Sequence, residues 1–166
     1  MARNETTLAE VLQRVVARLI SQVADATSST CYISLDPDSL PVGNPGEFVY
    51  VVTPAPSGSF DESYQVGGGQ DQCSVAWPIV VTIHSTVAQD EEGRDAQFLN
   101  DSTLGIVVKT TAVFKAMVVH DLQDGSTNEI LNQMIHVSDA AVDRNRSKRV
   151  GSMQLGFGVE FDWNLS

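Results

Sequence analysis

The side chains that could do chemistry in this chain lie too far apart, or in the wrong order, for a recognisable catalytic or metal site. His84, His120 and His136 fall in three separate segments, without the H-x-x-x-H or H-E-x-x-H spacing that puts two ligands on one helix face. No G-x-S-x-G sequence offers a nucleophile. Each histidine is therefore expected to be structural or on the surface.

Two short stretches have some features of ligand-binding loops but lack the residues that such loops need. The segment from Asp121 to Glu129 lacks the alternating ligands of a calcium loop, and Gly67 to Gly69 lacks the Gly-Lys-Ser/Thr ending of a phosphate loop. The three glycines should instead give flexibility and allow close approach of the backbone. We expect no catalytic residue, no cofactor and no metal ligand, and thus a protein that is not an enzyme.

The charged residues give a more specific indication. The formal net charge is −11, which argues against a general nucleic-acid binder, because such proteins need a basic surface. Four of the ten basic residues nevertheless fall within six positions: Arg144, Arg146, Lys148 and Arg149. We expect this basic tip to contact a protein partner, with the acidic run 90–95 as one candidate, and a solvated tip or a phosphate site as alternatives.

The sequence also indicates the compartment. No apolar run approaches the ~18 residues of a membrane span, and the first residues lack the apolar core of a secretory signal. Cys31 and Cys73 form no C-x-x-C pair, so two reduced, buried thiols are favoured over a disulfide. We expect a protein of the cytoplasm, or of a particle assembled there.

Hydrophobic periodicity predicts two helices. Thr7 and Glu10 form a capping box, and apolar residues then recur at helical spacing to about Asp25. A second helix is expected from Asp101 or Ser102 to about His120. Its apolar stripe would consist of Leu104, Val107, Val108, Thr111, Phe114, Met117 and Val118.

The same analysis predicts five strands, at 31–35, 47–53, 74–86, 133–142 and 153–165. Pro78 removes one backbone donor and is expected at a sheet edge or a bulge. In the last strand every odd position from Met153 to Leu165 is apolar, which predicts one buried face. This strand is longer than the usual ~5–6 residues, which suggests that a neighbouring subunit uses part of it.

Together these elements predict a single α+β domain over 1–166, with a mostly antiparallel sheet of four to five strands and two helices packed on one face. A long loop at 53–72 should protrude, with Phe60 and Tyr64 as apolar anchors for a partner. The chain should close with a hairpin at 133–165 that carries the basic tip between its strands.

The order of these elements resembles that of the tail-terminator (tail-completion) proteins of long-tailed bacteriophages. The likeness lies in the amphipathic first helix, the strand pair 47–53 and 74–86 around a long Pro/Gly loop, and the acidic stretch before the second helix. The closing hairpin, which ends in the segment from Gly156 to Trp163, completes it. The resemblance covers nearly the whole chain but includes no invariant motif, so it assigns no binding residue.

The resemblance implies a structural virion protein of the tail and neck region. Six copies would form a ring that caps the tail tube, stops its polymerisation and joins it to the head connector or stopper protein. Such a ring would carry a formal charge of about −66, so DNA would pass through it without being bound. The alternatives are another neck component (adaptor or stopper), a tail-tube subunit, or a small enzyme or ligand-binding domain.

Overall fold

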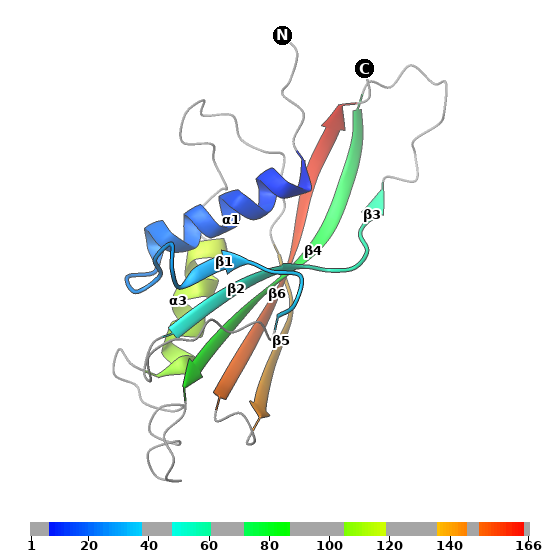
Figure 1. The fold of residues 1–166 in the computed structure, drawn as a ribbon. Coiled ribbons are helices and arrows are strands. Elements are labelled where there is room, and N and C mark those ends of the chain that lie inside the picture. The colour runs from blue at the N-terminus through cyan, green and yellow to red at the C-terminus, as the bar shows by residue number, and fades with distance from the viewer. Residues whose placement is uncertain are drawn as a thin grey trace.

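The chain folds as an α+β domain in the computed structural model, which describes residues 7–37, 48–60, 72–86, 105–118, 136–145 and 150–164. Two helices and one mixed sheet make up the described part (Figure 1). The elements are α1 (Leu8–Gln22), β1 (Cys31–Ile33), β2 (Phe48–Pro54), β3 (Ser59–Phe60), β4 (Gln72–Thr86), α3 (Ile106–Val118), β5 (His136–Asn145) and β6 (Val150–Asn164).

The sheet has the strand order β1-β2-β4-β6-β5, and β3 pairs with β4 off this path. Only the β1–β2 pair is parallel among the described strands, so the expectation of a mostly antiparallel sheet is confirmed. β4 and β6 pair along their full length, from Gln72 opposite Asn164 to Thr86 opposite Val150. These two long strands form the central ribbon of the fold.

Helix α1 begins at the predicted capping box. The Thr7 hydroxyl accepts a hydrogen bond from the Glu10 amide at 3.2 Å, and the Glu10 carboxylate accepts one from the Thr7 amide at 2.8 Å. Both bonds satisfy amides that have no partner within the helix. The helix ends at Gln22, three residues before the predicted end.

One hydrophobic core unites both helices with alternate residues of the central strands. Four of the odd positions of β6 are buried as predicted, namely Leu155, Val159 and the fully buried Phe157 and Phe161, whereas Met153 is only partly buried. The cross-strand partners of the two phenylalanines on β4, Ile79 and Val75, belong to the same cluster. Helix α1 contacts β1 and β2, while α3 contacts β4 and β6. That both helices pack on one face of the sheet stays a prediction.

The apolar stripe predicted for the second helix is confirmed at Met117, which is fully buried, but is wrong at three other positions. Val107, Thr111 and Phe114 are exposed, and the buried side consists of Ile106, Val113, Ala116 and Met117. Helix α3 carries apolar residues nearly all round, so periodicity alone could not choose the side that meets the core. Residues 101–104, where this helix was expected to start, lie outside the described residues.

Pro78 lies at an interruption of the pairing on one side of β4, between Ile79, which pairs with Pro54 of β2, and Ala76, which pairs with Ser59 of β3. The Ala55 amide donates to the Pro78 carbonyl at 2.9 Å, and an ordinary residue at 78 would donate back to the Ala55 carbonyl. Proline has no such donor. The indole Nε1 of Trp77 donates to the Ala55 carbonyl instead, at 2.9 Å. A side-chain donor thus replaces the missing backbone donor, which explains how a central strand tolerates proline.

The closing hairpin is present, and β5 pairs antiparallel with β6. A register shift between Val137 and Asp139 marks a β-bulge, which was not predicted. β5 also extends three residues beyond its expected end at Val142. It continues to Asn145, so Arg144 belongs to the strand and pairs with Gly151 rather than lying in the connecting loop. A run of charged residues reads as a loop in sequence, but an edge strand tolerates it.

Candidate functional site

The structure places two of the six predicted interface residues. Phe60 ends β3 and pairs with Val75, and Arg144 lies near the end of β5. The other four, Tyr64, Arg146, Lys148 and Arg149, lie outside the described residues.

Phe60 and Arg144 are at opposite ends of the central ribbon. Phe60 pairs with Val75 of β4, and Arg144 pairs with Gly151, which is opposite Ser85 of the same strand. Val75 and Ser85 are separated by about 33 Å along β4 at the usual rise per residue. The structure therefore does not bring Phe60 and Arg144 into one site.

The loop predicted at 53–72 is shorter at both ends than expected, because Thr53 and Pro54 belong to β2 and Gln72 belongs to β4. It begins with a turn against β4. Part of it forms β3, and Gly58 packs directly on Trp77, where an added Cβ would lie 2.3 Å from a ring carbon. The Trp77 ring therefore holds this turn in two ways, by contact with Gly58 and by its hydrogen bond to Ala55. Residues 61–71 lie outside the described part, so their protrusion stays a prediction.

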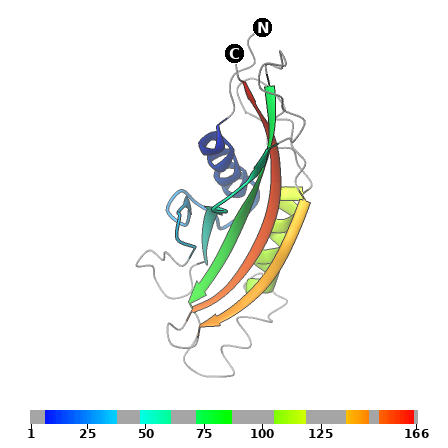
Figure 2. The ribbon, with the colours of Figure 1, turned by 90° about the vertical axis from the view of Figure 1, so that its right-hand side faces the viewer.

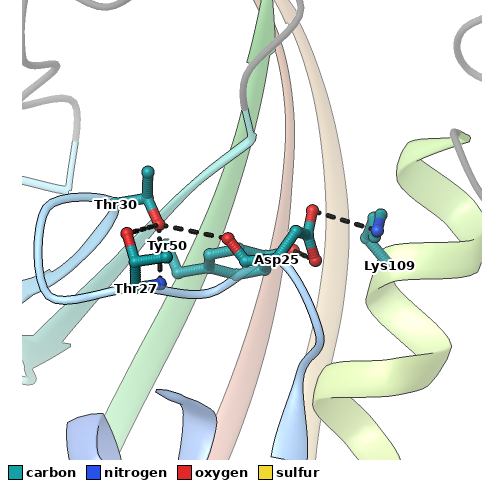
Figure 3. A network of polar contacts seen from close by, with 5 residues as sticks. All are labelled: Asp25, Thr27, Thr30, Tyr50 and Lys109. Carbon is teal, nitrogen blue, oxygen red and sulfur yellow. Dashed lines mark hydrogen bonds and ion pairs between the residues drawn. The ribbon is translucent and has the colours of Figure 1, made fainter.

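A polar network links three elements inside the fold (Figure 3). Asp25 accepts a hydrogen bond from the Tyr50 hydroxyl at 3.0 Å and forms an ion pair with Lys109 at 2.9 Å. The Lys109 ammonium also lies 5.3 Å from the centroid of the Phe48 ring. Asp25 thereby joins the turn after α1 to β2 and α3, and its position, about a third exposed, keeps the carboxylate solvated.

The turn that presents Asp25 is itself fixed by threonines. The Thr27 amide donates to the Thr30 hydroxyl at 2.9 Å, and this hydroxyl donates to the Asp25 carbonyl at 3.3 Å. Such side-chain bonds replace the backbone bonds that a helix would continue to make. Sequence analysis missed the network, since residues 25, 50 and 109 come together only through tertiary packing.

Burial changes the acidity of two groups near this network. Burial, reinforced by the negative charge of Asp25 and the hydrogen bond to it, raises the pKa of Tyr50 well above its ordinary value. Burial also raises the pKa of the Cys31 thiol from 9.0 to about 12. Cys31 is a free thiol, as expected, and at neutral pH it is an inert core residue rather than a nucleophile.

His84 is a structural residue, as expected. Its side chain is buried, and Nε2 donates to the Pro37 carbonyl at 2.6 Å. It lies on the sheet face opposite the main core, where Val51 and Thr82 are also fully buried. His136 begins β5, and His120 lies outside the described residues.

The exposed apolar side chains gather in two places that sequence analysis did not single out. Four large hydrophobic residues of the described part are exposed: Ile33, Leu35, Val107 and Phe114. The first two lie at β1, an edge strand, and the last two lie on α3. Scattered single residues need no explanation, but paired ones at an edge and on a helix are candidate contact surfaces.

Nothing in the described residues forms a metal site, since no three His, Cys, Asp or Glu side chains group there. No helix within that same part of the chain is long and apolar enough to cross a membrane. Comparison with models of known protein families and with curated proteins gave no match.

Proposed function

We propose that this protein is a structural, non-enzymatic subunit of a phage virion: a tail terminator that forms a ring on the tail tube. The ring would stop tube polymerisation and join the tail to the head connector. The observation that carries this proposal is the central ribbon, in which two strands of 15 residues pair along their whole length.

The ribbon extends past its neighbours. β5 stops pairing at Gly158, so β6 from Val159 to Asn164 pairs, within the described residues, with β4 alone. Figure 1 shows this end of β4 and β6 reaching beyond the rest of the sheet. β3 covers part of the β4 edge here, at Val75 and Ala76, whereas the outer edge of β6 has no paired strand within the described residues and is ready to pair. Such an extension is typical of a subunit that completes its sheet in an assembly.

The two ends of the ribbon suit two axial partners. One end carries Phe60, with Tyr64 nearby in sequence, and the other carries Arg144, with the rest of the basic tip nearby in sequence. A ring that joins two structures needs a contact surface on each side. We assign the tail tube protein and the head-connector or stopper protein to these two ends, without fixing which end takes which partner.

The charge of the chain fits the same role. A formal charge of −11 per subunit repels phosphate over a Debye length of about 8 Å at physiological salt. DNA would therefore pass through the ring without specific binding. The protein would assemble in the host cytoplasm and reside in the neck region of the virion.

The test is a tube-growth assay with the major tail tube protein of the same phage. Adding this protein should cap the growing tubes and shorten them, and light scattering of the protein alone or with tubes should show a closed oligomer. A strict monomer that leaves tube growth unchanged would refute the proposal. Binding to the connector without any effect on tube growth would support an adaptor or stopper instead.

A reversal of the basic tip tests its assignment to one end. Replacing Arg144, Arg146, Lys148 and Arg149 by glutamate should weaken binding to one axial partner and leave the melting temperature of the isolated protein unchanged. Binding to both partners at wild-type strength would exclude the tip from the contacts.

A further inference from the structure

We propose that neighbouring subunits join head to tail, with the exposed stripe of α3 on one copy packed against the β1 flank of the next. The α3 stripe consists of Val107, Thr111 and Phe114, and the β1 flank consists of Ile33, Leu35 and Asp36. This inference rests on the ring-forming role proposed above and names the lateral interface of that ring.

The α3 stripe has the pattern of a packing surface. Its three residues are spaced i, i+4 and i+7, which aligns them along one side of the helix. Both large side chains are about 40% exposed: Val107 at 43% and Phe114 at 40%. The opposite side, with Ile106, Val113 and Met117, is already in the core. Helices that are apolar on both sides are usually buried on both sides.

The β1 flank is a second apolar surface at a sheet edge. Leu35 is 86% exposed and Ile33 is 40% exposed. β1 pairs only with β2 among the described strands, since it is the first strand of the sheet order. Ile33 is the last residue of β1 and Leu35 follows it by two residues, so two exposed apolar side chains lie beside an edge strand.

The two surfaces lie on opposite flanks of the molecule. Lys109 points toward Asp25 at the end of α1, and Phe114 and Val107 lie about 140–160° from Lys109 around the helix. The α3 stripe therefore faces away from α1, whereas β1 contacts α1. In Figure 2, α3 (yellow-green) lies on the side of β5 (orange), although one side of α3 contacts α1 (blue). Surfaces on opposite flanks join head to tail, and such contacts form a ring where the rotation between subunits closes and an open filament where it does not.

A second copy is the occupant that explains both surfaces at once. If different proteins covered them, two partners would be needed, whereas one head-to-tail contact covers both. The charges beside the surfaces also match: exposed Asp36 adjoins Leu35, and exposed Lys115 adjoins Phe114. Apolar anchors with a polar rim of opposite charges are the usual composition of a protein interface.

Two single variants and their mixture test this interface. Leu35→Glu removes the β1 flank and Phe114→Glu removes the α3 stripe, and each should weaken self-association roughly tenfold or more. Ala17→Glu adds the same charge at an exposed position of α1 and serves as the control. Thr111→Glu is a second stripe variant for the case that Phe114→Glu unfolds. Melting temperature and circular dichroism verify the folding of each variant.

The mixture separates head-to-tail contact from symmetric contact. Phe114→Glu keeps an intact β1 flank and Leu35→Glu keeps an intact α3 stripe, so together they should form a one-to-one dimer that grows no further. Native mass spectrometry would detect it. The interface is refuted, while the ring function stands, if Phe114→Glu and Thr111→Glu both form rings like the wild type. It is also refuted if Leu35→Glu alone or Phe114→Glu alone forms a dimer. A wild-type protein that stays monomeric, alone and with tail tubes, refutes both.

Discussion

The substitution Tyr50→Phe tests whether the Asp25 network stabilises the fold. Tyr50 is fully buried, so phenylalanine keeps the ring contacts and removes only the hydroxyl that donates to Asp25 at 3.0 Å. Hydrogen bonds to charged groups contribute about 1.5–3 kcal/mol, and water can replace this bond because Asp25 is about a third exposed. We expect a loss near the lower limit, about 1.5 kcal/mol at neutral pH.

The loss should depend on pH in a defined direction. The pKa of Tyr50 is raised in the folded protein, and an unfolded tyrosine titrates near 10. Below about pH 10 Tyr50 stays protonated in both the folded and the unfolded protein, so its full contribution to stability is present. Above about pH 10 the unfolded protein releases this proton first, so the stability of the folded protein falls. By about pH 10.5 the free energy of unfolding of the wild type should therefore fall by about 0.8 kcal/mol more than that of Tyr50→Phe.

Urea titrations at about pH 8 and about pH 10.5, followed by tryptophan fluorescence, would measure both effects. Other titrating groups are common to the two proteins, so they cancel in the difference between wild type and variant. If this difference is zero at about pH 8, the hydrogen bond does not stabilise the fold. If the difference is the same at both pH values, the folded protein does not hold Tyr50 in its protonated form above about pH 10.

Three further substitutions examine the core, the loop turn and the buried thiol. Phe161→Ala should cost roughly 3–5 kcal/mol in a urea titration because its ring is fully buried, and a loss below about 1 kcal/mol would place it outside the core. Gly58→Ala should cost about 1–3 kcal/mol, since the new Cβ would overlap the Trp77 ring; an unchanged urea midpoint would contradict this contact. Between about pH 7 and pH 10 the free energy of unfolding of the wild type should fall by about 1.4 kcal/mol more than that of Cys31→Ala, because folding raises the pKa of the Cys31 thiol from 9.0 to about 12. Parallel pH profiles of the two proteins would show that Cys31 does not contribute to the pH dependence of stability.

Local sequence patterns predicted an element correctly where the pattern marks the same residues that pack in the folded core. The capping box at Thr7 specifies where a helix begins, and the structure confirms it. The alternation in β6 specifies a strand with one buried side, and the structure confirms this from Leu155 to Phe161. The predicted stripe of α3 was wrong at three positions because apolar residues surround the helix and give no preferred side. Only the position of α1 and the ribbon decides that Met117 is buried and Phe114 is not.

Features that depend on distant residues could not be predicted. Proline is compatible with the centre of this sheet because Trp77 supplies the hydrogen bond to Ala55, and that compensation is a matter of geometry. The network of Asp25 with Tyr50 and Lys109 likewise depends on the crossing of three elements. The exposed pair Ile33 and Leu35 becomes meaningful only when β1 is known to be the edge strand.

The salt dependence of self-association can decide which contacts hold the proposed ring together. Subunits of formal charge −11 repel one another, and salt at about 1 M shortens the Debye length to about 3 Å and removes most of this repulsion. An apolar contact between the α3 stripe and the β1 flank should therefore strengthen as salt rises. A contact held by the basic tip and the acidic run 90–95 should weaken, because the same screening removes its attraction. Sedimentation at about 0.1 M and 1 M salt distinguishes the two. Dissociation at the higher concentration would assign lateral assembly to the basic tip and contradict the α3 interface.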